Sequence, residues 1–491
     1  MRRPVPRQPE REQPGAEASA SRASSASRLP LAACAAAAAL AALLAGCAVE
    51  APEAPASTVH VPTAWRTAIG PAEGAPTLER DWWQSFGDPA MNALVAAALE
   101  HNGDLRTARA RVAQYRALLT VTESNQKPNV GFDATPTRTR QLLWNGTPYV
   151  TNVYQFEFQA SYELDVWGRL AAQTSASKAS YQAEMANADA VALSIAATVA
   201  SGYLNLRGLD AQLELTEATL KLRERSRDLA QRQFEVGYSS RLEWLQAQAE
   251  YQTTAEQVPQ LKRAIFEQEN ALSILTGANP GAVMRGTQLE SLMPPPVPAG
   301  LPSDLLRRRP DIARAEFNLV ASNANLVATK DQLLPEFKLT GAGGIQNLKI
   351  HDFFNAPTAL WHLTGVMVEP IYEGGRIEAA TEAAAAQRDQ TVFAYESAVR
   401  SAFAETDNSL GALYRLKEQA VQNDARRATA AETLRIAHER YRNGYASYLE
   451  ELDAQRTLYN ADVGRLQLRT RILIASVDLY RAMGGGWSSS P

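Results

Sequence analysis

The sequence predicts a mainly α-helical protein with membrane-type β-strands, built as a tandem structural repeat. Three observations predict this fold class. Similar residues recur at a constant spacing of 207 positions, one segment alternates apolar and polar residues over eleven positions, and two long runs contain no proline. At 1.5 Å per residue, each such run can form a helix on the order of 100 Å long.

The repeat extends through both halves of the chain. A constant offset over about 180 residues, without net insertion, indicates that the halves form the same structure. We therefore predict a first repeat over 89–293, a Pro-rich linker over 294–302, a second repeat over 303–486 and a tail over 487–491. The matched pairs include Asp104 and Asp311, Pro128 and Pro335, Gly168 and Gly375, Gly237 and Gly444, and Gly277 and Gly484.

The composition argues against several classes of protein. The chain has 491 residues, 49 basic and 53 acidic side chains, two cysteines and five histidines. This balance argues against a nucleic-acid partner held by bulk positive charge. The histidines show no metal-ligand spacing, and no phosphate-binding glycine loop or hydrolase nucleophile motif occurs. We expect no enzyme activity, no metal site and no cofactor.

The N-terminus has the parts of a secretory signal. A basic segment precedes an apolar run from Leu29 to Ala45, and the run ends in Leu-Ala-Gly-Cys, which resembles the bacterial lipobox. We predict a lipoprotein-type signal peptide over 1–46 and covalent lipid on Cys47, followed by an extended segment over 47–88. Ala48, rather than Asp, follows the cysteine, which implies sorting to the outer membrane. The alternative is a transmembrane anchor, for which the run is marginally short.

Each repeat is expected to open with two helices. In the first repeat, Asp88-Pro89 predicts a helix start that continues to about His101. Asn102-Gly103 interrupts it, and Asp104 is expected to cap a second helix that ends before Pro128. The second repeat has the same signals at Ser303-Asp304, at Pro310-Asp311 and before Pro335.

A strand pair follows in each repeat, at about 129–165 and 336–372. The run 154–164 has strict period two and the length of a membrane-spanning strand. We expect Tyr154, Phe156, Phe158 and Tyr162 to face lipid, with Glu157 and Glu163 on the luminal face. The alternation is weaker in the second repeat, and two soluble hairpins are the alternative interpretation.

Long helices complete each repeat, over 169–277 and 376–483. Their only breaks are short turns at Gly237-Tyr238 and Gly444-Tyr445, where glycine suits a left-handed helix C-cap. Four strands cannot close a barrel, and an open edge in lipid leaves backbone groups unpaired. Eight strands, from two chains, form a barrel filled by its own side chains. We therefore expect a homotrimer with a twelve-stranded outer-membrane β-barrel, continued by a long periplasmic α-helical barrel.

Four segments resemble the outer-membrane efflux factor family, which includes TolC-like channels. They are WWQSFGDPAMNALVAAALEHNGDL (82–105), LLRRRPDIARAE (305–316), IYEGGR (371–376) and YRNGYASYLEELDAQ (441–455). With the lipobox, the chain is most similar to the NodT-type lipoprotein branch of this family. The resemblance implies an outer-membrane channel of a tripartite multidrug efflux system, with a periplasmic membrane-fusion adaptor and an inner-membrane RND-type transporter as partners. The transported substrate is not implied.

The turns farthest from the barrel are candidates for a periplasmic gate. Glu450 and Asp453 lie three residues apart just beyond the second turn, and the resemblance implies an acidic ring there. Solvated coiled-coil surface is the alternative for this pair. The candidate gate and selectivity residues are Tyr441, Arg442, Gly444, Tyr445, Glu450, Asp453, Gly237, Tyr238 and Glu243. A periplasmic helical scaffold lipoprotein without a pore remains the alternative function, and conductance measurements would distinguish the two.

Overall fold

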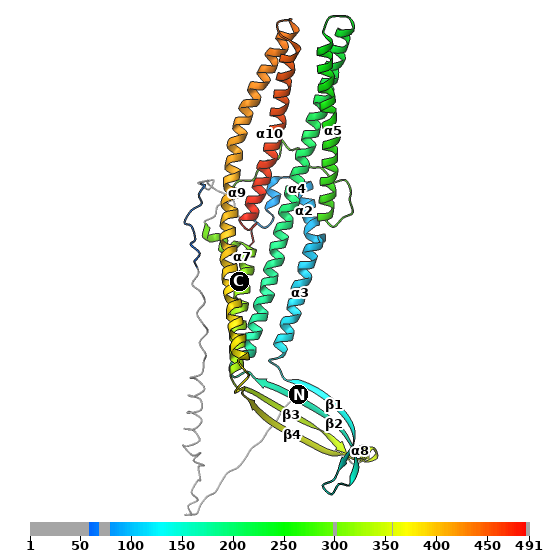
Figure 1. Cartoon of the computed structure of the whole chain (residues 1–491), viewed down its shortest axis with the longest axis vertical. Helices are drawn as coiled ribbons and strands as arrows, with labels where there is room; N and C mark the ends of the chain where they lie inside the picture. Colours follow the sequence, from blue (N-terminus) through cyan, green and yellow to red (C-terminus); the bar gives the residue numbers. More distant parts are fainter. Residues whose placement is uncertain (1–57, 68–78, 298–301, 356, 488–491) are drawn as a thin grey trace, which may run out of the picture. The chain divides into compact units, whose positions relative to one another are not determined.

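The computed structural model describes residues 58–67, 79–297, 302–355 and 357–487. The predicted signal peptide, Cys47 and part of the N-terminal segment therefore lie outside the described residues. The described residues all belong to one compact unit. Within this unit, a four-stranded sheet and the tips of two long helical hairpins occupy opposite ends (Figure 1).

The elements follow the same order in both halves. The first half contains η1 (Trp82–Phe86), α2 (Pro89–His101), α3 (Gly103–Ser124), β1 (Asn129–Leu142), β2 (Pro148–Leu164), α4 (Arg169–Glu235) and α5 (Arg241–Leu275). The second contains η2 (Pro302–Asp304), α6 (Leu305–Arg308), α7 (Pro310–Lys330), η3 (Asp331–Leu333), β3 (Glu336–Asn347), α8 (Ile350–Asn355), β4 (Thr358–Val368), α9 (Arg376–Arg442) and α10 (Tyr448–Ala482).

The two halves agree in their longest helices. α4 and α9 each have 67 residues, and α5 and α10 each have 35. The halves differ at their first helix, because α2 has 13 residues whereas α6 has only four. They differ again between the strands, where the second half inserts the short helix α8. Helix α8 was not among the elements predicted from the sequence.

Side-chain caps explain several helix starts. Asp88 accepts hydrogen bonds from the backbone N–H groups of Ala90 and Met91 at the start of α2. At α3 the expected cap was wrong: Asn102, not Asp104, accepts from the backbone N–H groups of Asp104 and Leu105. The amide oxygen of Asn102 lies at the N-cap position, whereas Asp104 already belongs to the first helical turn.

The helices pack around α4. Helices α3, α5, α7 and α10 contact α4, and α9 packs against α7 and α10. α4 is the one described helix long and apolar enough by composition to cross a membrane, and 44% of its apolar window is buried inside the protein. Pro259 lies within α5, which continues past it as a helix.

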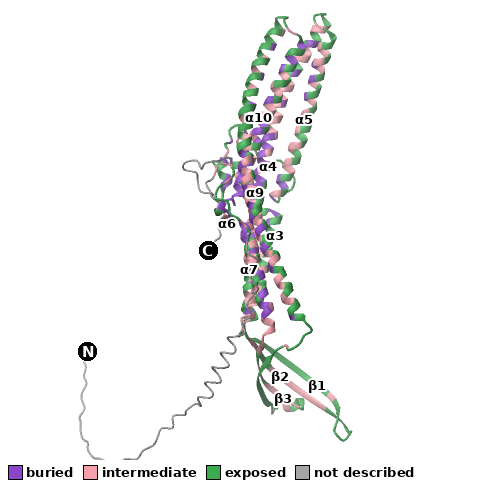
Figure 2. Cartoon of the chain, turned by 60° about the vertical axis from the view of Figure 1, so that its left-hand side comes forward, coloured by how far each residue is buried: buried purple, intermediate pink, exposed green. Residues whose placement is uncertain are grey.

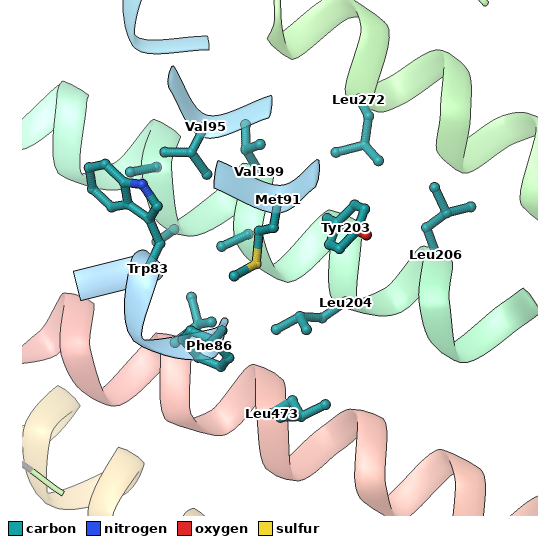
Figure 3. Close-up of a cluster of buried hydrophobic side chains, with 14 of the residues drawn as sticks. Trp83, Phe86, Met91, Val95, Val199, Tyr203, Leu204, Leu206, Leu272 and Leu473 are labelled. Carbon is teal, nitrogen blue, oxygen red and sulfur yellow. The ribbon is translucent and has the colours of Figure 1, made fainter. Parts of the chain in front are cut away.

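The main core lies where α2 meets the middle of α4 and the ends of α5 and α10. Most of the large buried side chains of the protein lie in this region, whereas the sheet is mostly exposed (Figure 2). Met91, Tyr203 and Leu272 come from three different helices and point into this core (Figure 3). The Tyr203 hydroxyl donates to the buried carboxylate of Asp88 at 2.9 Å. Burial raises the pKa of Tyr203 to about 12.

Candidate functional site: the amphipathic sheet and the helical tips

The sheet order is β1-β2-β3-β4, with every neighbouring pair antiparallel. Directly paired residues lie on the same face of a sheet. Phe132 pairs with Phe158, Phe158 with Gly343, and Gly343 with Trp361. One face therefore carries Val130, Phe132, Ala134, Tyr154, Phe156, Phe158, Tyr162, Leu339, Ile345, Trp361, Leu363 and Met367. Most of these apolar side chains are exposed, which suits a surface that faces lipid.

The opposite face is mostly polar. It carries Asp133, Thr135, Gln155, Glu157, Gln159, Glu163, Lys338, Thr340, Gln346, His362 and Thr364. Glu163 is bound by Arg169 at the start of α4, and Arg169 also lies 3.4 Å from Glu336 of β3. The division into an apolar and a polar face, seen in the alternation of β2, thus holds for all four strands. The sequence of β2 alone could not indicate this.

Tyr154, Phe156, Phe158 and Tyr162 lie on one face of β2, with different neighbours. Phe158 is 63% exposed, and its ring lies 5.1 Å from that of Phe132. Phe156 is half-buried because Phe353 of α8 packs against it, with ring centroids 4.7 Å apart. The β3–β4 connection therefore covers the distal end of the apolar face. This contact depends on α8.

Each helical hairpin ends in a glycine turn. Gly237 and Gly444 have φ of 76° and 74°, a left-handed conformation that favours glycine. The next backbone N–H groups, of Tyr238 and Tyr445, donate back to the carbonyls of Gln233 and Arg440. This pattern is the Schellman motif, which satisfies the last helical carbonyls. Both tyrosine side chains are exposed, at 86% and 79%.

The remaining gate candidates are spread over two environments. Tyr441 is half-buried against Tyr448, and burial raises its pKa, as does the nearby Glu243 of the other hairpin. Arg442 and Asp453 are exposed, and neither forms an ion pair with the described residues. Glu450 is exposed and lies 3.6 Å from Arg440. The structure thus brings Tyr441 and Glu243 together.

A small apolar cluster joins the two hairpin tips. Ala230 and Ala247 of the α4/α5 hairpin pack with Tyr448 and Leu452 of α10. Trp244 of α5 borders the cluster and stacks on Phe234, with centroids 5.5 Å apart and planes 9° apart. Burial raises the pKa of Tyr448 to about 12.

A buried carboxylate joins the hairpins two turns further from the tips. Glu250 of α5 is 7% exposed and lies 2.7 Å from the Arg223 guanidinium of α4. On its other side, Arg456 of α10 donates from Nε to Oε1 of Glu250 at 2.7 Å. Nearby, the Tyr459 hydroxyl of α10 donates to Gln257 of α5 at 2.6 Å. The Glu250 carboxylate thus pairs with one cation from each hairpin.

Four residues of this contact were not predicted from the sequence: Arg223, Glu250, Arg456 and Tyr459. A comparison of the repeats could have found part of this set. At the offset of 207, Arg223 corresponds to Ala430 and Glu250 to Thr457. Each position thus carries a charged residue in the first repeat and a small neutral residue in the second. Such a difference between repeats indicates a contact that only one of them makes. Among the described residues, no group of His, Cys, Asp and Glu could hold a metal ion.

A membrane-type sheet with one apolar face, continued by long helical hairpins with joined tips, defines the class of protein. It is an outer-membrane channel of the trimeric, TolC-like kind with a large periplasmic helical portion. Solved structures support this. The chain of the outer-membrane channel OprN superposes with a TM-score of 0.82 at 26% identity, covering 89% of this chain and 99% of that one.

Sequence comparisons give the same result. The sequence model of the outer membrane efflux protein family matches residues 94–278 and 301–485. The probable efflux pump outer membrane protein TtgC of Pseudomonas putida is 32% identical, covering 86% of this chain and 88% of the relative. The cation efflux system protein CusC of Escherichia coli is 30% identical, covering 83% and 88%.

The chain belongs to the outer membrane efflux protein family. It is the outer-membrane channel component of a tripartite efflux system, assembled as a trimer with an adaptor and an inner-membrane pump. The family consists of channels rather than enzymes. The two family matches are offset by 207 residues, which confirms the tandem repeat.

Proposed function

We propose that this chain forms a passive exit duct whose periplasmic end is closed at rest by the joined hairpin tips. The inter-hairpin contact of Arg456 with Glu250 carries the proposal, because it ties α10 to α5 near the end that must open. Opening separates the hairpins and exchanges this ion pair for water. The duct itself performs no covalent chemistry, and the inner-membrane partner, of the RND type, supplies the energy.

The exposed carboxylates near the turns are proposed to set ion selectivity. Glu450 and Asp453 lie at the start of α10, and three chains bring six such groups to the narrow end of the helical barrel. A ring of carboxylates attracts cations and disfavours anions. The Arg440 guanidinium, 3.6 Å from Glu450, offsets part of this charge. The duct is therefore expected to favour cationic cargo.

The test is the conductance and the cation-to-anion permeability ratio of the purified trimer in planar bilayers. Glu450→Gln/Asp453→Asn should lower the permeability ratio severalfold. The control is Glu256→Gln/Glu267→Gln, which removes two exposed carboxylates from the middle of α5. An unchanged ratio in the first variant would place these carboxylates outside the pore. A wild-type trimer that never conducts would contradict the duct itself.

We also propose that the mature chain starts at Cys47 and carries lipid there. The Leu-Ala-Gly-Cys sequence supports this proposal. Each buried methylene of an acyl chain adds about 0.8 kcal/mol of membrane affinity. Metabolic labelling with palmitate should mark the wild type and fail to mark Cys47→Ala. Labelling that survives in the processed variant would rule the assignment out.

The sheet is proposed to present its apolar face to lipid and its polar face to the lumen. The strand register supports this orientation, because the charged side chains of β1–β3 within the span paired with Tyr154–Leu164 all lie on one face, as do the amide side chains other than Asn347 at the distal end. In hydrocarbon a lysine or arginine at the bilayer midplane costs roughly 2–4 kcal/mol, so charges belong on the luminal face.

A further inference from the structure

Two arginines lie on the apolar face just beyond its distal end. Arg138 pairs with Asn152 and Arg140 with Val150, in a register that runs without a bulge from Asn129 to Leu142. They therefore share the face of Phe132 and Ala134, unlike the acidic side chains Asp133 and Glu157 on the opposite face.

The position of these arginines corresponds to a headgroup layer. The alternating run of β2 ends at Tyr154, which pairs with Pro136. Arg138 and Arg140 lie two and four residues beyond Pro136. At 3.3 Å per residue and a strand tilt of about 40°, they lie roughly 5 and 10 Å above the edge of the hydrocarbon.

Both arginines lack an internal partner. They are exposed, and neither forms an ion pair or a side-chain hydrogen bond with the described residues. Residues 134–156 contain no Asp or Glu at all, so this hairpin end has a local charge of +2 from its arginines. An unpaired guanidinium pair next to lipid calls for an external anion, and arginine's planar donors bind phosphate in a bidentate geometry.

The surrounding side chains also suit a membrane interface. Trp144 at the β1–β2 turn is 98% exposed, and Phe354 and Ile350 of α8 are 73% and 53% exposed. Tryptophan is enriched where hydrocarbon meets headgroups, and the exposed apolar side chains of α8 can bury their surface on the hydrocarbon side of that boundary. The nearest acid on α8, Asp352, lies 3.2 Å from His351 and so has its own partner.

We propose that Arg138 and Arg140 bind the phosphate groups of glycolipid headgroups in the outer leaflet of the outer membrane. This inference rests on the proposed orientation of the sheet. Each trimer offers three such sites, one beside each β1 edge. The interaction fixes the depth of the barrel relative to the outer leaflet of the membrane. It adds a contact specific to one kind of lipid, whereas the apolar face contacts any hydrocarbon.

The experiment titrates the full-length trimer in neutral detergent with diphosphorylated lipid A and counts bound lipid by native mass spectrometry. A basic side chain near an anionic headgroup contributes about fivefold to affinity, so Arg138→Gln/Arg140→Gln should weaken binding roughly 25-fold. The control, Arg106→Gln/Arg111→Gln, removes two exposed arginines from α3 and should bind as the wild type does.

Two ligand arms make the result specific. Dephosphorylated lipid A should bind the wild type as weakly as the diphosphorylated form binds the double variant. Equal binding of both lipids by the wild type overturns the proposal, and this comparison needs no variant to fold. Inorganic phosphate should not compete at millimolar concentration; competition would show an anion site without lipid specificity and would also overturn it.

A separate measurement tests the orientation on which the inference rests. Arg138→Cys is treated with a charged thiol reagent while the channel conducts. Unchanged conductance places residue 138 outside the lumen, as the proposal requires. A block places it inside and overturns both the inference and the sheet orientation, whereas failed lipid binding with unchanged conductance overturns only the inference.

Discussion

The Arg456–Glu250 contact gives the most direct test of the closed tips. Arg456→Gln removes the cation from α10 while leaving Glu250 paired with Arg223 at 2.7 Å. It therefore weakens the connection between hairpins without leaving a buried charge unpaired. Glu250→Gln is the poorer perturbation, because Arg223 is only 8% exposed and breaking a buried pair costs about 3–5 kcal/mol of stability.

The size of the effect follows from exposure. The Arg456 side chain is 47% exposed, so solvent screens its interaction and a value of about 1 kcal/mol is appropriate. Three symmetry-related contacts break when the trimer opens, which gives about 3 kcal/mol in total. At 1.4 kcal/mol for each tenfold change, the closed-to-open ratio should fall on the order of 100-fold.

Single-channel recording in planar bilayers measures this ratio as the fraction of time spent in the larger conductance state. The matched control is Arg435→Gln, which removes an exposed arginine whose partners, Glu432 and Glu439, both lie on α9. Arg456→Lys keeps one charged donor and should give an intermediate value. Equal open fractions for Arg456→Gln and Arg435→Gln would refute the reasoning that the contact holds the tips closed.

Three further predictions address the sheet, the core and the N-terminal segment. Phe158→Arg should reduce heat-resistant trimer on gels far more than Gln159→Arg, by roughly 2–4 kcal/mol per chain, because only residue 158 is expected to face lipid; equal tolerance would contradict the alternating membrane strand. Asp88→Ala should lower the free energy of unfolding by about 2–4 kcal/mol, since it removes the α2 cap and a buried hydrogen-bond acceptor, and Asp88→Asn should lower it less; similar denaturation curves for both variants would argue against this role. Hydrogen bonds from the N–H and hydroxyl of Thr58, and from a neighbouring arginine, hold the pKa of Glu396 below its usual range. The ionised Glu396 carboxylate therefore stabilises the contact with Thr58 above the pKa of the unfolded state, and this stabilisation is lost as pH falls through the lowered pKa of the folded state. Hydrogen exchange in residues 58–67, corrected for the intrinsic rate, should therefore be faster in acid. The Glu396→Gln variant should show the faster exchange already at pH 7. Exchange in the variant equal to that of the wild type at pH 7 would contradict it.

The sequence alone was sufficient to predict the repeat, its long helices and its strand pairs. Long alanine-rich runs without proline predict long helices, and strict period two over 154–164 distinguishes a strand from a helix. Glycine at 237 and 444 predicted the turns, since those positions require a positive φ. These features depend on residues close together in the chain, where local sterics and periodicity decide the conformation.

The ion pairs between the hairpins depended on which faces of the helices pack against each other, and the sequence alone did not predict this. Glu250 and Arg456 are separated by 206 positions, and nothing local distinguishes them from the many exposed charges of α5 and α10. Likewise, the period of β2 indicated two faces, but the four-strand register placed Arg138 and Arg140 on the apolar one. Helix α8 and its contact of Phe353 with Phe156 had no counterpart in the first repeat.

The division has one physical reason. Hydrophobic periodicity specifies the secondary structure and the apolar face of each element, because it reflects what that element must bury. Hydrogen bonds and ion pairs are short-ranged and directional, so they form only after the whole chain has set the rotation and register of its elements. The sequence by itself thus determined the repeat, the long helices and the membrane strands, while the tertiary structure decided which charges join the hairpins and which stay exposed at the distal end of the apolar face.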